Sequence, residues 1–226
     1  MHIPDGYLGP QTYVPLFGVS AALVGVGLKK MKAQLSSRQV PYLSMAAAFS
    51  FLIMMFNVPI PGGTTGHAVG GALIAILLGP WTAVVAVSVV LIIQAFVFGD
   101  GGITAIGANC FNMAIVLPFA SYWIFKLVNG NAKDGARLYI SSFLSGYLGL
   151  VIASIFAGVE FGIQPLIAHT ANGAPLYAPY PLSIALPAMA VEHLMVFGIV
   201  EGLVTALLVK YFVKNEAGLV FAMTEA

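Results

Sequence analysis

Charged side chains are scarce in this sequence. Only 8% of its 226 residues are Asp, Glu, Lys or Arg, whereas 60% are hydrophobic. A soluble domain covers its surface with roughly 25% charged residues, so this composition excludes an ordinary soluble protein. It is typical of helices that pack together in a bilayer, where lipid surrounds them. The formal net charge of +1 offers no basic surface for nucleic acid.

The sequence has a single cysteine and lacks two common catalytic motifs. The single cysteine, Cys110, excludes an internal disulfide and leaves the redox compartment open. The chain has no Gly-x4-Gly-Lys-Ser/Thr phosphate loop, so we expect no ATPase activity of its own. It also lacks the His-Glu-x-x-His helix that binds zinc in many metalloenzymes. We therefore expect that this chain is not an enzyme.

Long apolar runs dominate the chain. A helix needs roughly 20 apolar residues to cross the hydrocarbon core of a membrane. The sequence predicts one all-α transmembrane domain, residues 1–226, with about seven spans near 12–29, 42–57, 67–80, 82–99, 104–127, 137–159 and 183–211. The third run is short and is followed by the Gly79-Pro80 break, so whether it crosses alone at full depth is open.

The basic residues predict the orientation of the bundle. With seven spans, all nine Lys and Arg fall on one side of the membrane: Lys29, Lys30, Lys32, Arg38, Lys126, Lys133, Arg137, Lys210 and Lys214. Positive charge is retained in the cytoplasm, so we expect the N-terminus outside and the C-terminus inside. Losing or gaining one span would break this agreement. We expect a multi-pass protein of the cell membrane.

The start of the chain has no basic residue ahead of its first apolar stretch, whereas a cleaved signal peptide has one. We therefore expect the first residues to be retained. His2 is bulky, and trimming of an initiator methionine favours a small second residue. We therefore expect Met1 to be retained as well.

His2, at the start of the chain, and His67, at the head of the third predicted span, fall on the same outer side in this topology. The amine of Met1, the amide nitrogen of His2 and the imidazole Nδ1 of His2 can close fused five- and six-membered chelate rings around an ion. The His67 imidazole can occupy the fourth corner. Four nitrogens in a square suit Ni(II) or Cu(II), whereas Zn(II) prefers a tetrahedron. Since the amide must lose its proton, metal affinity should fall in acid.

The alternative is that His2 belongs to a disordered start and that His67 merely caps a helix. The neighbouring residues favour the metal site. Pro4, Asp5 and Gly6 predict a turn, which would fold the N-terminal segment, residues 1–11, back into the bundle. Glycines on both sides of His67 allow another chain segment to approach closely.

Three separated stretches carry a family resemblance. The opening MHIPDGYLGP, the segment GGTTGHAVGG and the segment GGITAIGANCFNMA resemble the NikM/CbiM family, the substrate-binding (S) subunits of energy-coupling factor (ECF) transporters for nickel and cobalt. The resemblance implies that the transported ion binds to Met1, His2 and His67, the constellation reached above. Cobalt members often read Met-Glu where this chain has Pro4-Asp5, which favours Ni(II) over Co(II) as the substrate.

The resemblance also implies partners, namely a transmembrane coupling (T) subunit, two cytoplasmic ATPase subunits and a small accessory membrane subunit. This chain would bind the ion outside and tilt in the membrane lipid to deliver it. The alternative is a stand-alone secondary divalent-metal carrier, which needs ionisable groups lined up across the bilayer. Only Glu192 and Glu201 are available for such a path, which disfavours a carrier.

Asp5, Asn109 and Asn112 are candidates for supporting the metal site. Both asparagines lie at the outer end of the fifth predicted span, where they could hold the N-terminal segment by hydrogen bonds. The family resemblance supports this role. The alternative is that asparagines between helices serve only to join those helices.

The remaining polar residues have no assigned role in the site. Glu192, His193 and Glu201 lie in the last span, where we expect buried hydrogen bonds or a contact with a partner. We expect His169 to be a surface residue of the connection 160–182. Whether this long connection acts as a lid is open.

Overall fold

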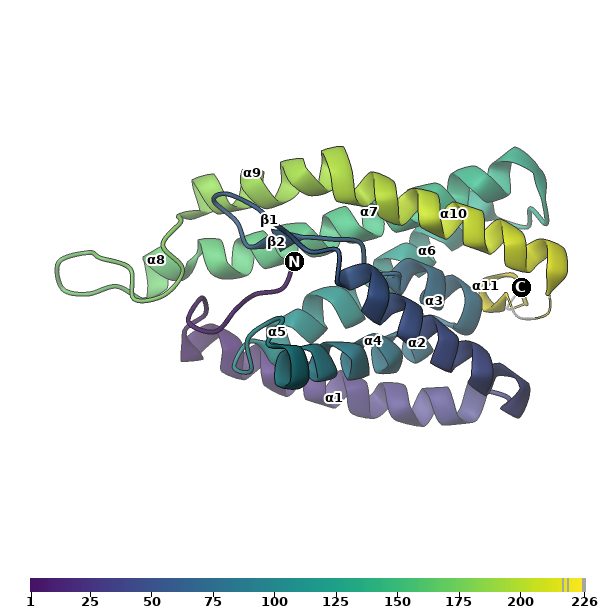
Figure 1. Ribbon diagram of the computed structural model, residues 1–226, viewed down its shortest axis with the longest axis horizontal. Helices are drawn as coiled ribbons and strands as arrows, with labels where there is room; N and C mark the ends of the chain where they lie inside the picture. The colour runs from purple at the N-terminus through teal and green to yellow at the C-terminus, as the bar shows by residue number, and fades with distance from the viewer. Residues whose placement is uncertain (217, 219, 225–226) are drawn as a thin grey trace.

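The structure, a computed structural model, describes residues 1–216, 218 and 220–224. It is built almost entirely of helices (Figure 1). Among the described residues, five helical stretches are long and apolar enough to cross a membrane: Pro10–Gln34, Pro80–Phe98, Ile106–Asn129, Gly135–Ile167 and Leu182–Asn215. The prediction of an all-α, multi-pass membrane protein is confirmed.

The second and third predicted spans are shorter in the structure, as α2 (Val40–Met54) and α3 (Gly71–Leu78). Gly70 and Gly79 bound α3 with φ of 76° and 90°, backbone conformations that L side chains rarely adopt. The expected span 67–80 is therefore a buried helix of eight residues preceded by irregular chain. This irregular chain carries His67 into the bundle.

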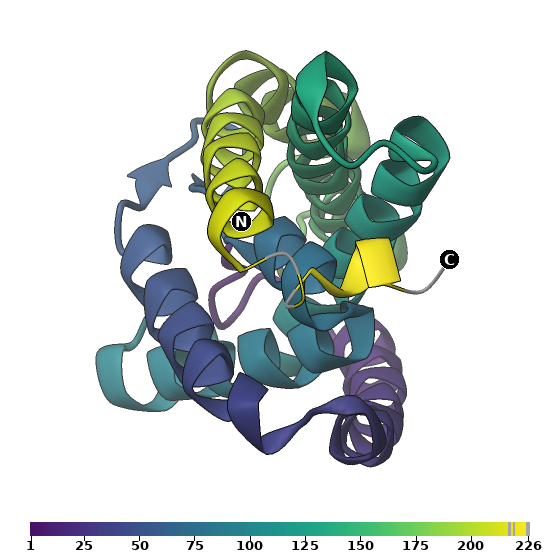
Figure 2. The same cartoon turned by 90° about the vertical axis from the view of Figure 1, so that its right-hand side faces the viewer.

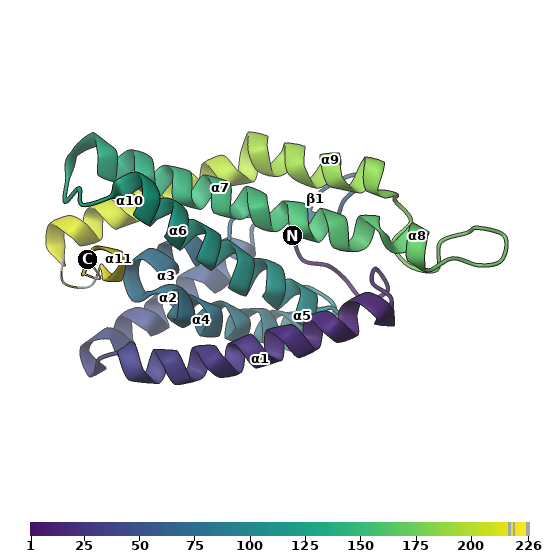
Figure 3. The ribbon, with the colours of Figure 1, turned by 180° about the vertical axis from the view of Figure 1, so that it is seen from behind.

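The helices pack in two groups, which Figures 1 and 3 show from opposite sides. In one group α7 (Gly135–Gly162) packs against α6 (Leu117–Asn129), α9 (Leu182–Glu192) and α10 (Gly198–Asn215). In the other, α1 (Pro10–Gln34) packs along α4 (Pro80–Ile93) and α5 (Ile106–Asn109). Small residues allow the close contacts, since a Cβ at Gly149 would collide with the Ser121 hydroxyl.

Several long helices contain π-helical turns: η2 (Gln94–Phe98), η3 (Cys110–Val116) and η4 (His193–Phe197). Such turns are rare and are frequently found at functional sites. Each carries a buried polar side chain, Gln94, Asn112 and His193 respectively. Polar groups of otherwise apolar spans therefore face the interior of the bundle.

One end of the bundle collects the basic connections. The connection between α1 and α2, which contains η1 (Ser37–Gln39), and the α6–α7 connection lie at this end with the C-terminal segment (Figures 1 and 2). Arg38 forms an ion pair with Glu216 at 3.0 Å. The short helix α11 (Phe221–Thr224) packs on α3 and α6.

The other half of the bundle holds the N-terminus and the irregular connections. Strands β1 (Val58–Pro59) and β2 (Thr65–Gly66) form an antiparallel ribbon between α2 and α3, in which Val58 pairs with Gly66 and Pro59 with Thr65. Helix α8 (Gln164–Ile167) leads into a projecting hairpin. These connections and the inserted N-terminus form the candidate site.

Candidate metal centre

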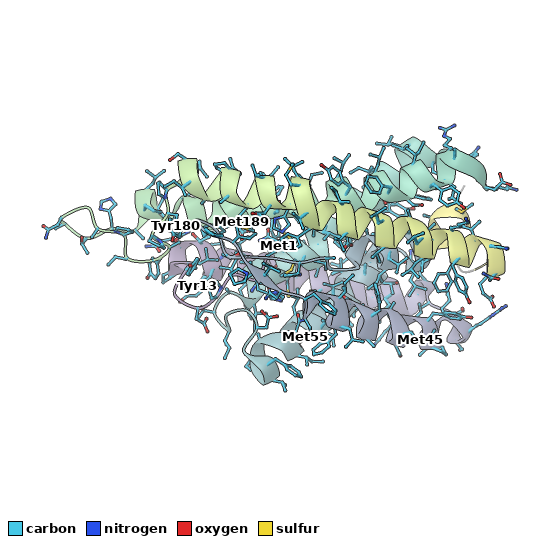
Figure 4. The ribbon with its side chains drawn as sticks, turned by 45° about the horizontal axis from the view of Figure 1, so that its top comes forward. Met1, Tyr13, Met45, Met55, Tyr180 and Met189 are labelled. Carbon is cyan, nitrogen blue, oxygen red and sulfur yellow. The ribbon has the colours of Figure 1, made fainter. Side chains whose placement is uncertain are left out.

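The N-terminal segment enters the bundle. Met1 and Ile3 are fully buried, and His2 is only 3% exposed. Figures 1 and 4 show the N-terminus and Met1 within the bundle, not at its edge. The side chains of Met1 and Ile3 belong to the hydrophobic core, and removal of this apolar surface from water stabilises the inserted chain.

A turn at Asp5 and Gly6 leads the chain back out. Gly6 has a φ of 82°, and Asp5 accepts hydrogen bonds from the backbone N–H groups of Ile103 (3.1 Å) and Thr104 (2.8 Å). The Thr104 hydroxyl also donates to Asp5, and its bond is the largest cause of the lowered pKa of this carboxyl. Asp5 therefore anchors the turn to the chain before α5 as a charged carboxylate.

Asn109 fixes the backbone of Ile3. Its Oδ1 accepts a hydrogen bond from the Ile3 N–H at 2.8 Å, and its Nδ2 donates to the Ile3 carbonyl at 3.1 Å. The Gly102 N–H donates to the same carbonyl at 2.9 Å. Asn112, the other asparagine predicted to hold this segment, instead donates to Glu160 at 2.7 Å. Asn109 therefore makes the expected contact, and Asn112 makes a different one.

His2 and His67 meet in the interior, where their ring centroids lie 4.7 Å apart. His2 Nε2 donates to Oε1 of Gln94 at 3.1 Å, and His67 Nδ1 donates to the carbonyl of Ala68 at 3.0 Å. These two bonds leave lone pairs on Nδ1 of His2 and on Nε2 of His67. Both atoms are buried and have no hydrogen-bond partner among the described residues.

The amine of Met1 influences the pKa of both imidazole rings, His2 and His67. It donates to the carbonyl and to the hydroxyl of Thr65, the latter at 3.0 Å. Burial lowers the pKa of this amine well below its usual value. Burial, followed by the charge of the amine, lowers the pKa of His2 to about 3 and shifts that of His67 in the same direction. The pocket therefore favours the neutral, metal-binding form of each nitrogen.

Main-chain nitrogens are needed to complete a metal site here. In the part of the chain that the structure describes, no three His, Cys, Asp or Glu side chains gather as a possible metal cluster. The amine of Met1 and the amide of His2 are the main-chain nitrogens that can chelate together with His2 Nδ1. The structure brings the rings of His2 and His67 together and buries the Met1 amine, which forms hydrogen bonds with Thr65.

Three polar residues that the sequence did not assign to the site surround it. Gln94 bonds to His2, Thr65 bonds to the amine of Met1, and Asp100 Oδ1 lies 3.5 Å from His2 Nδ1. Burial raises the pKa of Asp100. Only Gln94 left a sequence signal, since a polar residue inside the apolar run LIIQAF indicates an inward-facing group.

The last span contributes His193 and Glu201. His193 donates through Nδ1 to a carbonyl of the preceding turn at 2.7 Å and lies close enough to act electrostatically on His67. Glu201 accepts hydrogen bonds from the backbone N–H groups of Val69 (2.7 Å) and Gly70 (2.9 Å). The expected buried hydrogen bonds are confirmed for both residues. Glu201 also fixes the chain directly after His67.

The connection 160–182 contacts the N-terminal segment where that segment leaves the bundle. Gln164 Oε1 accepts a hydrogen bond from the Gly9 N–H at 3.0 Å, and the Ala178 N–H donates to the Tyr7 carbonyl at 3.1 Å. The segment is thus held at both ends, by Asn109 inside and by this connection outside.

Known proteins resemble the chain over nearly its whole length. Residues 2–219 match the CbiM family model, described as a cobalt uptake substrate-specific transmembrane region. The chain is 52% identical over 216 residues to the fused nickel transport protein NikMN of Rhodobacter capsulatus. It is 50% identical over 219 residues to the probable fused nickel transport protein LarMN of Lactiplantibacillus plantarum.

Those two matches cover 95% and 96% of this chain but 62% and 65% of the relatives, so the chain spans slightly less than two thirds of their length. A solved structure matches more completely. The crystal structure of a truncated transition metal transporter has a TM-score of 0.90 and 48% sequence identity, covering 95% of this chain and 99% of that chain.

Proposed function

Since the chain belongs to the CbiM family, we propose that it captures Ni(II), with Co(II) as the alternative substrate, for an ATP-driven importer of the energy-coupling factor type. One observation carries the proposal. Nδ1 of His2 and Nε2 of His67 are buried and unpartnered among the described residues, next to an amine whose pKa burial lowers. Unpartnered buried nitrogens of this kind are costly unless a ligand binds them.

The proposed coordination is a square of four nitrogens: the Met1 amine, the His2 amide, His2 Nδ1 and His67 Nε2. Gln94 supports it, because a hydrogen bond from the opposite ring nitrogen fixes the tautomer of a metal-binding histidine. Square geometry suits Ni(II), and the nickel transport names of the two relatives support this substrate. Pro4-Asp5 in place of Met-Glu supports nickel over cobalt as well.

We further propose that α2 and α3 complete seven crossings of the cell membrane, with the metal centre towards the outside. The basic connections gather at one end of the bundle (Figure 2), and positive charge is retained in the cytoplasm. The inserted N-terminus lies in the other half (Figure 1). The C-terminus would then be cytoplasmic.

Energy for import would come from partner subunits, because the chain has no phosphate loop. We propose a transmembrane coupling subunit, two cytoplasmic ATPases and a small accessory membrane subunit as partners. The chain itself would bind and release the ion without acting as an enzyme. Nickel uptake should then require the ATPases, whereas a stand-alone carrier would import nickel without them.

Insertion of one leucine between Met1 and His2 tests the coordination. The histidine becomes the third residue, so the amine, two amides and the imidazole close a local four-nitrogen chelate without His67. We expect nickel uptake to be lost, although the terminus still binds the ion. In the wild-type protein, square-planar Ni(II) should be yellow and diamagnetic.

A matched control is insertion of one leucine after Gly173, in the projecting hairpin, which should leave uptake intact. Mass spectrometry of the purified chain must show Met1 as an unblocked first residue. Unchanged uptake after insertion at Met1, or a paramagnetic nickel centre, would contradict the proposed coordination.

A further inference from the structure

Asp100 holds a carboxylate next to the proposed chelate. Its Oδ1 lies 3.5 Å from His2 Nδ1, and its side chain is only 18% exposed. Asn57 Nδ2 donates to the same Oδ1 at 3.0 Å, and the Asp100 N–H donates to the Gln94 carbonyl at 3.0 Å. Asn57 therefore holds the carboxylate, and Gln94 holds the backbone of the same residue.

The position of Asp100 is unfavourable without an ion. Because Gln94 Oε1 accepts a hydrogen bond from the N–H at His2 Nε2, the Nδ1 atom presents a lone pair on the side where the carboxylate lies. Two electron-rich atoms repel each other at this separation. A cation on Nδ1 turns the repulsion into an attraction.

The net charge of the proposed nickel complex also calls for a nearby carboxylate. Ni(II) carries two positive charges, and the deprotonated His2 amide removes one, while the amine and the imidazoles are neutral. One positive charge then remains in a buried pocket, where an uncompensated charge is strongly unfavourable. Asp5 and Glu201 accept hydrogen bonds from backbone N–H groups, whereas Asp100 is a carboxylate that lies 3.5 Å from His2 Nδ1.

We propose that Asp100 is the counter-charge of the loaded site, a carboxylate that lies outside the square of nitrogens and brings the charge of the Ni(II) complex to zero. This inference rests on the proposed function. Asp100 remains outside the coordination sphere because nitrogens fill all four corners of the proposed square. The arrangement favours divalent ions, since a monovalent or trivalent ion leaves a net charge.

The test is Asp100→Asn, which removes the charge but keeps an oxygen that accepts from Asn57. We expect the dissociation constant for nickel to rise by about 10- to 100-fold, the usual effect of losing a group that supports metal ligands. The absorption spectrum and the diamagnetism of the bound ion should not change, because the four nitrogens remain. Asp134→Asn, the same substitution at an exposed aspartate, is the matched control and should bind as the wild type does.

A second variant separates charge from geometry. Asn57→Ala keeps the Asp100 carboxylate and removes only its amide donor, so its affinity loss should be clearly smaller than that of Asp100→Asn. Equal losses, or wild-type affinity in Asp100→Asn, overturn the inference. A change of spectrum in Asp100→Asn also overturns it, by making Asp100 a direct ligand. If the wild-type protein itself lacks a square-planar spectrum, it is the proposed coordination that fails.

Discussion

Two histidines of this chain sit in similar local structures but in different surroundings. His67 follows the β1–β2 ribbon, and His169 forms the β-bridge of the projecting hairpin with Pro175. In each, ring Nδ1 faces the carbonyl of the next residue, at 3.0 Å for His67 and 3.1 Å for His169. Yet His67 is fully buried, whereas His169 is exposed, as predicted for a surface residue.

The difference shows that the surroundings, and not the local hydrogen bond, distinguish the candidate metal ligand His67 from the surface residue His169. The bond to the next carbonyl fixes the tautomer in both rings. Only around His67 do the inserted N-terminus and Glu201 exclude water and hold the chain. The hairpin with His169 projects from the bundle (Figures 1 and 3).

The largest expected change in nickel affinity comes from substituting the two histidines in turn. His67→Ala should weaken nickel binding by more than about 100-fold, because even groups outside the coordination sphere contribute 10- to 100-fold. His169→Ala should leave the affinity unchanged, since water surrounds that ring. Calorimetric titration of both purified variants with nickel measures the difference. Comparable losses in the two variants would show that the buried pocket is not the binding site.

The sequence predicted the long apolar helices and the convergence of His2 with His67. It could do so because long apolar runs, basic residues and a turn signal at Pro4, Asp5 and Gly6 are local patterns. The span 67–80 was predicted too long, because the two glycines that bound α3 act through backbone conformation and not through polarity.

The sequence did not predict the approach of Asp100 to His2 or of His193 to His67. Asp100 follows η2 and His193 begins η4, so both residues lie at π-helical turns, whose positions the sequence does not reveal. The pairing of Glu201 with the chain after His67 is equally non-local. Such contacts arise from packing of distant segments and leave no pattern in a single sequence.

An intermediate loss of nickel affinity is expected from substitution of Glu201. This carboxylate holds the chain after His67 and has no counterpart in the hairpin that carries His169. Its Oε2 accepts from Val69 and Gly70, and its Oε1 accepts from the Ala72 N–H at 3.4 Å. Glu201→Gln replaces one acceptor by a donor and should free the chain beside His67. We expect the nickel affinity to fall by about 10-fold, with a broadened spectrum of bound nickel.

Glu192→Gln is the matched control for this variant, because Glu192 lies in the same span but is partly exposed. It should bind nickel as the wild type does. Wild-type affinity in Glu201→Gln would mean that packing alone positions His67, without the carboxylate.

The smallest expected effect is on the pH dependence of the free energy of unfolding, measured in the absence of metal. Burial lowers the pKa of His2 from 6.5 to about 3, so between these values the unfolded chain binds a proton that the folded chain does not. The contribution of His2 to the free energy of unfolding is therefore present above pH 6.5 and is lost as the pH falls. Between about pH 7.5 and 5.5 this histidine alone should cost about 1.4 kcal/mol. In detergent, thermal unfolding of His2→Ala should depend less on pH than that of the wild type, and an equal dependence would show that the buried ring is not held neutral.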